Sequence, residues 1–214
     1  CKIYTGAVIG SIPQDLKYKG EDTKLIIGEN NVIREYITIN IGTIENGVTK
    51  VGSNNLLMAY SHIAHDCVVG DDCVLANGAT LAGHVKIEDK AVIGGLVAIH
   101  QFTRVGKLSI IGGCSKVVQD IPPFSTCDGH PARVYGLNFV GLKRAQASPQ
   151  AISDLKSAFK YFFFSGLNKA SAVEKIQSSL SRSPELVYLM DFMLVSSRGV
   201  ARAIQTEELS ASNH

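Results

Sequence analysis

Three of the histidines in this chain lie in one segment of small and aliphatic residues, "SHIAHDCVVGDDCVLANGATLAGH", residues 61–84. They are His62, His65 and His84. Imidazole ionises near neutral pH, so a neutral histidine can take a proton from a substrate, and a carboxylate beside it stabilises the imidazolium that forms. Because Asp66 directly follows His65, the sequence predicts a general base at His65 that Asp66 supports.

Other groups could complete such a site. The backbone N–H of Gly83 could stabilise a developing oxyanion, because no side chain there obstructs the approach of a substrate. Asp15 and Lys17 add a carboxylate and an ammonium group within a predicted loop. A group of histidines could equally hold zinc. These residue types predict acid–base or metal chemistry and leave the substrate open.

A six-residue repeat must position these side chains. From Val51 to Val117 every sixth residue is Val, Leu or Ile, and the same phase includes Ile27, Ile33 and Ile39. The residue four places later is usually small, and the next residue after each aliphatic one is usually Gly or Ala. Neither the helix period nor the strand period explains this pattern, whereas the interior of a narrow stacked coil does. The sequence predicts an all-β parallel β-helix whose coils have three six-residue sides.

A coil of this size stacks residue 65 under residues 83 and 101, which places the candidate residues on one edge. His100 occupies a position that is elsewhere Gly or Ala, so we expect its ring to project into a space that is kept small in other coils. Left-handed backbone angles are expected at corners occupied by Asn or Asp. The predicted corner residues are Asn30, Asn31, Asn54, Asp71, Asp72 and Asp89.

The domain organisation follows from where the repeat stops. We predict a β-helix over residues 1–140 with loop insertions at 10–24 and 43–50, a small helical domain over 141–205 and a polar tail over 206–214. The pairs Ser148-Pro149 and Ser183-Pro184 and the capping box from Ser171 to Glu174 predict three helix starts. The opening "CKIYTGAVIG" begins within the pattern, so further coils are expected before it.

Composition narrows the possible partners. The net charge is +2, which gives no general reason to expect binding to nucleic acid or to an anionic membrane, and no apolar run is long enough to span a bilayer. A cytoplasmic location is therefore predicted. The five cysteines form no CxxC pair, which disfavours a disulfide framework and a thiolate zinc site. Residues 141–205 carry nine Lys or Arg and four Asp or Glu, so this end could bind an acidic partner.

Together with the hexads, seven short motifs resemble the UDP-N-acetylglucosamine O-acyltransferase family, which carries out the first step of lipid A biosynthesis. They are "QDLKY" (14–18), "SHIAHDC" (61–67), "LAGH" (81–84), "IHQF" (99–102), "IGGCS" (111–115), "QDIPP" (119–123) and "GLNFVGLKR" (136–144). Hexads are common to many transferases, whereas "HIAHDC" together with "QDLKY" and "GLKR" is specific. The resemblance covers residues 1 to about 203.

The resemblance implies a left-handed β-helix that assembles as a homotrimer, with active sites in clefts between subunits. An R-3-hydroxyacyl group would pass from the phosphopantetheine of acyl carrier protein to the 3-hydroxyl of UDP-N-acetylglucosamine, without a metal or another cofactor. His65 would be the base, Asp66 would orient it, and the N–H of Gly83 would bind the oxyanion. Asp15, Lys17, His62, His84 and His100 would position the sugar and acyl group, and Gln101, Asn138 and Arg144 the UDP. Gly113 matches the position that limits acyl length and implies a longer chain.

Two residues depart from the family pattern, Val140 in place of an acidic residue and Ala145 in place of the second Arg of "KRR". One nucleotide contact and one phosphate or carrier contact are therefore not matched. Three other functions are alternatives: N-acylation of a UDP-amino sugar by the same fold with the same donor, a trimeric β-helix zinc enzyme of the carbonic anhydrase type, and a scaffold without chemistry.

Overall fold

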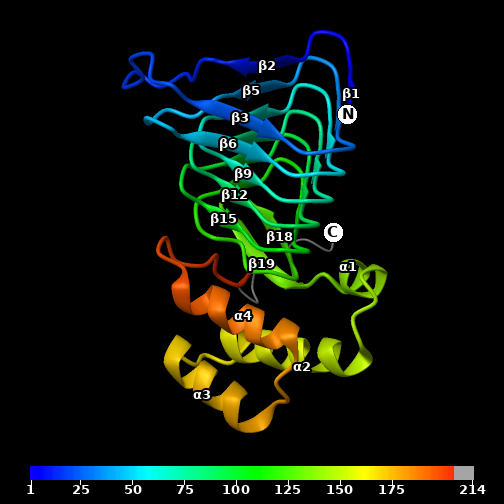
Figure 1. Ribbon diagram of the computed structural model, residues 1–214. Coiled ribbons are helices and arrows are strands. Elements are labelled where there is room, and N and C mark those ends of the chain that lie inside the picture. The colour runs from blue at the N-terminus through cyan, green and yellow to red at the C-terminus, as the bar shows by residue number, and fades with distance from the viewer. Residues whose placement is uncertain (205–214) are drawn as a thin grey trace.

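The computed structural model describes residues 1–204, which form a stack of short parallel strands closed at one end by helices (Figure 1). The polar tail predicted for 206–214 lies outside the described residues. In Figure 1 the coils descend from the blue N-terminal strands to the green ones, and the helices lie beneath them.

The strands form three sheets, here called A, B and C. Consecutive strands along the chain lie in different sheets except β18 and β19, which both belong to sheet A. Sheet A contains β1 (Lys2–Ile3), β4 (Val32–Ile33), β7 (Leu56–Leu57), β10 (Val74–Leu75), β13 (Val92–Ile93), β16 (Ile110–Ile111), β18 (Ser125–Gly129) and β19 (Ala132–Leu137). Sheet B contains β2 (Val8–Ser11), β5 (Thr38–Asn40), β8 (His62–Ile63), β11 (Thr80–Leu81), β14 (Ala98–Ile99) and β17 (Lys116–Val117). Sheet C contains β3 (Lys24–Ile27), β6 (Val48–Val51), β9 (Val68–Val69), β12 (Lys86–Ile87) and β15 (Arg104–Val105). Neighbouring strands are parallel except in the β18–β19 hairpin, which confirms the predicted parallel β-helix.

The register sets the length of a coil. His62 pairs with Thr80, and Thr80 with Ala98, so one regular coil takes 18 residues as predicted. Thr38 pairs with His62 across 24 residues because an insertion follows β5. The two predicted insertions both leave the stack between a strand of sheet B and the next strand of sheet C. We call this edge the B–C corner; in the regular coils it consists of residues 64–67, 82–85 and 100–103.

The repeating aliphatic side chains form the core. Leu57, Ile63, Leu75 and Leu81 have no exposed surface, and the small residues four places later, such as Ser61, are also buried. Burying each aliphatic side chain contributes about 1.5–3 kcal/mol. The alternation of large and small residues lets side chains from the three sheets interdigitate inside the coil, as the sequence predicted.

Corner residues adopt left-handed angles once in almost every hexad. Asn30, Asn54 and Asp72 do so with φ of 57°, 60° and 56°, as predicted. The same conformation occurs at Tyr60 and Phe102, both with φ of 62°, where the side chain gives no local reason for it. The stacked coil therefore imposes the corner geometry on residues that disfavour it.

The prediction was wrong for the other three corner residues, because their side chains link coils instead. The Oδ1 atom of Asn31 accepts the N–H of Asn55 at 2.8 Å, and the Oδ1 of Asp89 accepts the N–H of Asp71 at 2.9 Å. Asp71 in turn accepts the N–H of Ser53 at 2.6 Å. Each of these three side chains accepts a backbone N–H that has no partner in the strand ladders.

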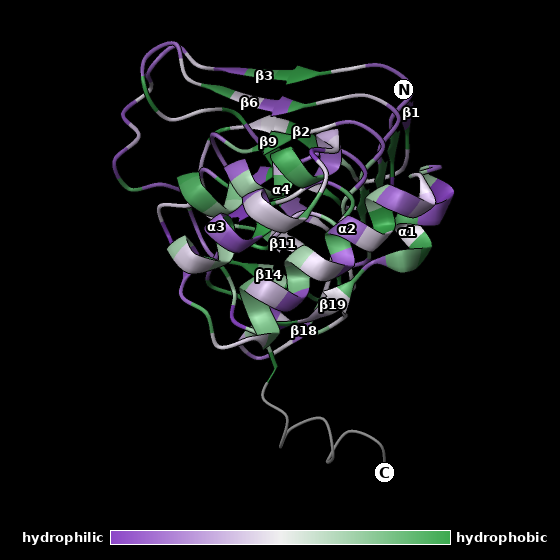
Figure 2. Cartoon of the chain, turned by 90° about the horizontal axis from the view of Figure 1, so that it is seen from below, coloured by the Kyte–Doolittle hydropathy of each residue, from purple (hydrophilic) through white to green (hydrophobic). Residues whose placement is uncertain are grey.

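The helices are α1 (Phe139–Arg144), α2 (Pro149–Phe159), one π-helical turn (η1, Lys160–Phe164), α3 (Lys169–Ser179) and α4 (Pro184–Val195). Seen from below, they lie across the end of the coils (Figure 2). Ser148 and Ser183 are N-caps, as predicted. The prediction of a capping box at Ser171 was wrong. The helix α3 begins earlier, with Asn168 as its N-cap, and Ser171 donates its N–H to the side-chain oxygen of Asn168. None of the helices in residues 1–204 is long and apolar enough to cross a membrane.

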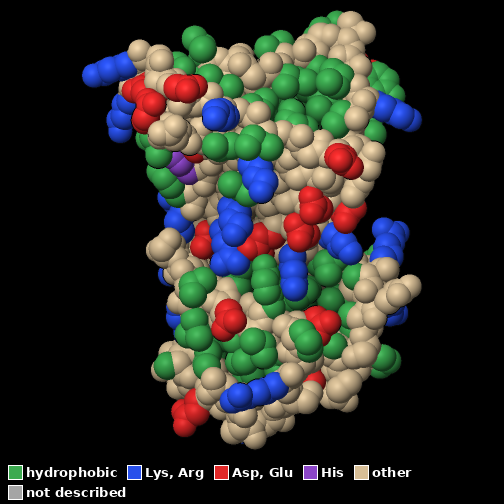
Figure 3. Space-filling model, viewed as in Figure 1, with side chains coloured by type: hydrophobic (Ala, Val, Ile, Leu, Met, Phe, Trp, Pro, Cys, Tyr) green, Lys and Arg blue, Asp and Glu red, His purple; other side chains and the backbone are tan. Residues whose placement is uncertain are grey.

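A charged contact fixes α4 to sheet C. Arg104 donates from Nε to the buried carboxylate of Glu88 at 2.6 Å, and the hydroxyl of Tyr188 donates to the same carboxylate. Burial, together with this hydrogen bond, raises the pKa of Tyr188. Basic side chains run down the face of sheet C and meet acidic ones where the β-helix joins the helical end (Figure 3).

Candidate active site

Three predicted site residues from two successive coils meet at the B–C corner. The Nδ1 of His65 lies 2.9 Å from Oδ2 of Asp66, and the Nε2 of His84 lies 3.7 Å from the same oxygen. The rings of His65 and His84 are edge to face, with centroids 5.2 Å apart. Because an ionised carboxylate only accepts hydrogen bonds, Nδ1 of His65 carries the proton and Nε2 is left as the basic nitrogen.

The carboxylate of Asp66 is held by the insertion after β5. The hydroxyl of Thr43 donates to its Oδ2 at 2.5 Å and the N–H of Thr43 to its Oδ1 at 3.2 Å. Burial alone would raise the pKa of Asp66, but the hydrogen bonds from Thr43 and His65 and the charge of His84 lower it below its usual value. Asp66 is therefore held as an anion beside the imidazole.

The first insertion brings a second carboxylate to the other side of the same ring. Asp15 places Oδ2 at 4.0 Å from Nε2 of His65. The backbone N–H of Lys17 donates to Oδ1 of Asp15 at 2.9 Å and so shapes this turn. The side chain of Lys17 is exposed, and its ammonium group contacts no carboxylate within residues 1–204.

His62 lies on the outward face of β8, next to His65. Its Nδ1 is 2.6 Å from the hydroxyl of Thr38 on the neighbouring strand β5. Burial, and then the charge of His65, lowers the pKa of His62. The fold therefore favours a neutral imidazole at His62.

Gly83 lies one coil away from His65, and a side chain there would occupy the place of the imidazole. A Cβ atom on residue 83 would stand 2.4 Å from Cε1 and 2.5 Å from Nε2 of His65. Within residues 1–204 the N–H of Gly83 has no hydrogen-bond acceptor. A backbone donor is thus available beside the basic nitrogen.

His100 lies at the same B–C corner, one coil further along the stack than His84. Its side chain is exposed, and its Nδ1 lies 3.2 Å from the backbone oxygen of Gln101, which is also exposed. Phe102, which the sequence analysis did not single out, stacks on His84 with centroids 4.6 Å apart.

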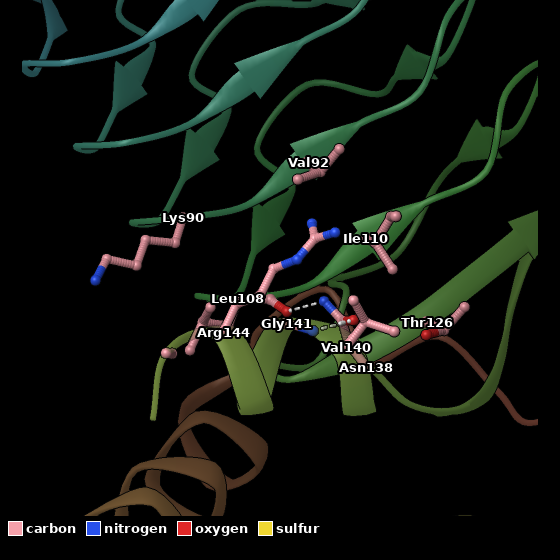
Figure 4. A pocket seen from close by; sticks show the side chains of 10 residues that line it. Lys90, Val92, Leu108, Ile110, Thr126, Asn138, Val140, Gly141 and Arg144 are labelled. Carbon is pink, nitrogen blue, oxygen red and sulfur yellow. Dashed lines mark hydrogen bonds between the residues drawn. The ribbon is translucent and has the colours of Figure 1, made fainter. Parts of the chain in front are cut away.

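Asn138 and Arg144 lie elsewhere in the chain. Both line a pocket of about 510 Å³ between α1 and the outer face of sheet A, and the Arg144 side chain extends from α1 into it (Figure 4). Asn138 is already engaged: its Oδ1 caps α1 through the N–H of Gly141, and its Nδ2 donates to the oxygen of Leu108. Gly113 is exposed at the corner between sheets A and B. A single chain therefore distributes the predicted residues over three different sides.

Three threonines that no sequence pattern marked support the histidines and Asp66. Thr38 contacts His62, Thr43 contacts the carboxylate of Asp66, and Thr49 accepts the N–H of Asp66 at 2.8 Å. No motif marks them, although Thr43 and Thr49 fall within the insertion that the broken repeat identified.

Donor atoms of His65, Asp66 and His84 lie within 4.8 Å of one another, a spacing that could also hold a metal ion. Oδ2 of Asp66 already accepts hydrogen bonds from His65 and from Thr43. A metal ion bound at this oxygen would compete with these two donors.

Comparisons with known proteins agree with these features. Residues 120–201 match the second domain of Udp N-acetylglucosamine O-acyltransferase, and residues 48–83 match the bacterial transferase hexapeptide repeats. An acyl-(acyl-carrier-protein)–UDP-N-acetylglucosamine O-acyltransferase of Gloeothece citriformis is 48% identical over 90% of this chain and 69% of its own length. The enzyme of the same name from Nautilia profundicola is 49% identical over 92% of this chain and 76% of its own.

A solved structure extends the likeness to three dimensions. The UDP-N-acetylglucosamine acyltransferase of Bacteroides fragilis 9343 superposes with a TM-score of 0.91 at 44% identity, covering 94% of this chain and 78% of that one. With relatives this similar over most of their length, the chain belongs to the UDP-N-acetylglucosamine O-acyltransferase family.

Proposed function

We propose that the chain transfers an R-3-hydroxyacyl group from acyl carrier protein to the 3-hydroxyl of UDP-N-acetylglucosamine, the first step of lipid A biosynthesis. The observation that carries this proposal is the setting of His65. Its Nδ1 is engaged by Asp66 at 2.9 Å, while its Nε2 carries no hydrogen from this contact and lies against Gly83, where a Cβ would stand 2.5 Å from it. This is the arrangement of a general base with an oriented ring.

In the proposed reaction, Nε2 of His65 takes the proton of the sugar 3-hydroxyl as its oxygen attacks the thioester carbonyl. The tetrahedral oxyanion accepts a hydrogen bond from the N–H of Gly83. When the intermediate collapses, the carbon–sulfur bond breaks, and the phosphopantetheine sulfur takes the proton that His65 held and leaves as the thiol. Asp66 stabilises the imidazolium between these two steps.

The surrounding residues position the substrates. Asp15 and His84 flank His65 closely enough to bind sugar hydroxyls, His62 lies beside them, and we place Lys17 and His100 at the rim of the site. We place Gln101, Asn138 and Arg144 toward the UDP. The last two line the pocket on sheet A, so a second subunit is needed to bring them to the histidines.

A homotrimer would supply that subunit. The outward positions of sheet A are apolar in five successive strands: Val32, Leu56, Val74, Val92 and Ile110. The equivalent positions of sheet C include Lys50, Lys86 and Arg104. An apolar stripe on one face only is typical of a subunit interface. We expect the molar mass in solution to be that of a trimer and Val92→Glu to reduce it, whereas Lys86→Glu leaves the trimer intact.

The acyl chain has room at Gly113. Gly113 is exposed and adds no side chain to this corner, and a Cβ on it would crowd the oxygen of Gly95 at 3.2 Å. We propose that the enzyme prefers longer acyl donors, and Gly113→Met should shift the product profile to shorter chains. A wild-type preference for short donors contradicts this proposal.

The test is transfer from R-3-hydroxyacyl carrier protein, measured with wild type and His65→Ala. Loss of the base should lower the rate by roughly 10²- to 10⁴-fold, and retention of most activity overturns the mechanism. UDP-N-acetylglucosamine and the corresponding UDP-amino sugar, tested side by side, decide between ester and amide formation. Wild-type activity that disappears on chelation and returns with zinc would instead favour the metal alternative.

A further inference from the structure

The insertion that follows β5 is built around one carboxylate. Thr43 lies in this loop and is buried, and both its hydroxyl and its N–H donate to Asp66, at 2.5 and 3.2 Å. The side chain of Asp66 retains 10% of its exposure, so little water can replace these donors. Hydrogen bonds to a charged acceptor in such a place are stronger than those between neutral groups.

Two glycines let the loop approach this closely. A Cβ on Gly42 would lie 2.8 Å from Oδ1 of Asp66, and a Cβ on Gly47 would lie 3.0 Å from the same oxygen. The N–H of Gly47 donates to the oxygen of Ile44 at 2.6 Å and closes the turn. The loop backbone therefore packs directly against the carboxylate.

The strand after the loop fixes the backbone of the same residue. The fully buried Thr49 accepts the N–H of Asp66 at 2.8 Å, and Asp66 has a left-handed φ of 57°. The chain segment that lengthens this coil from 18 to 24 residues thus holds both the main chain and the side chain of Asp66.

From these contacts we propose that Thr43 is a positioning residue for the acyl transfer reaction. It fixes the rotation of the Asp66 carboxylate, so that one lone pair of Oδ2 points at Nδ1–H of His65 and Nε2 stays free to take the substrate proton. The inference rests on the proposed function, since the catalytic step it serves is that of His65. Thr43 itself does not contact the reacting atoms.

The isosteric variant Thr43→Val removes the hydroxyl and keeps the loop volume. We expect kcat to fall about 10-fold or more, because the ring of His65 loses its fixed orientation. The KM for UDP-N-acetylglucosamine should stay within about 2-fold of wild type, because the hydroxyl of Thr43 donates to Asp66 and is not offered to the substrate. Thr43→Ser keeps the donor and should recover most of the rate.

Thr103→Val is the matched control. Thr103 is buried at the same corner, and within residues 1–204 its hydroxyl has no hydrogen-bond partner. The same change of side chain there should leave kcat and KM unaltered. Should Thr43→Val fail to fold, Thr43→Ala removes the same hydroxyl with less bulk and replaces it in every measurement.

A measurement independent of turnover separates this inference from the proposed function. Carbon NMR can follow the titration of the Asp66 carboxyl group directly. In Thr43→Val this group should titrate at a higher pH than in wild type, because a donor that lowers the pKa of Asp66 is lost. If Thr43→Val has the same Asp66 titration and the same kcat as wild type, the role proposed for Thr43 is overturned. So does a fall in kcat with an unchanged Asp66 titration. If wild type fails to acylate UDP-N-acetylglucosamine, the proposed function fails, and the titration still decides whether Thr43 controls Asp66.

Discussion

The imidazole of His65 occupies the space in which a side chain of residue 83 would lie: a Cβ there would be 2.4 Å from Cε1 and 2.5 Å from Nε2. The ring of His65 thus fits only because residue 83, one 18-residue coil later, is a glycine. The absence of a side chain at Gly83 also leaves its N–H beside the basic nitrogen.

Gly83→Ala should lower kcat/KM about 100-fold, because the methyl group displaces the His65 ring and shields the proposed oxyanion donor. The measurement is steady-state acyl transfer together with the melting temperature. Gly95→Ala is the control, since Gly95 holds the same position of a later hexad and a Cβ there meets only the oxygen of Asn77, at 3.3 Å. Equal activity of the two variants would remove Gly83 from the site.

The lowered pKa of His62 makes stability depend on pH. The folded state disfavours protonation of His62, so this group destabilises the fold progressively as the pH falls from the pKa of an unfolded histidine, about 6.5, through the lower pKa of His62 in the folded state. The urea midpoint of wild type should therefore decrease between about pH 7 and 5. His62→Gln should remove part of this decrease. A decrease of the same size in the variant would show that His62 is not its source.

Asn138 is expected to matter for stability, because it caps α1 and bonds to Leu108. Asn138→Ala should cost about 1 kcal/mol, measured by urea unfolding. Asn138→Asp keeps the cap and loses only the donor to Leu108, so it should cost less. If both variants keep full stability but raise the KM for the sugar nucleotide, Asn138 serves the nucleotide alone.

We expect the basic helical end to bind the acidic carrier protein. Lys156 and Lys160 are both exposed, on α2 and at the start of η1. Replacing both with Gln should raise the KM for acyl carrier protein several-fold at low salt, with less effect at high salt because ions screen exposed charges. Lys175→Gln on α3 is the control for a general loss of charge. An unchanged KM for the carrier in the double variant counts against this docking surface.

The fold was predictable because its rule is local and repeated. The aliphatic position at Leu57, Ile63 and Leu75 and the small residues that follow it determine the coil without reference to distant residues. The same stacking rule predicted that His65 and Gly83 would lie in neighbouring coils. It did not predict the direction of His100, because corner side chains project according to backbone angles that the hexad pattern leaves open.

The support of Asp66 was not predictable for a different reason. Thr43 reaches it from an insertion, where the repeat gives no register and a threonine has no distinctive spacing. At α3, Asn168 and Ser171 are both good caps, and only the packed structure selects Asn168. The separation of Arg144 from the histidines depends on how α1 folds back over sheet A, which no local pattern encodes.

The 18-residue register limits how the gene can change in length. Loss of one hexad between His84 and Lys116 would preserve the core pattern, yet it would rotate everything downstream by a third of a turn about the long axis. α1 with Arg144 would then lie above a different side of the prism, out of reach of its former partners. Loss of three hexads would only shorten the stack by one coil. Functional relatives that differ in length between His84 and Lys116 should therefore differ by whole coils.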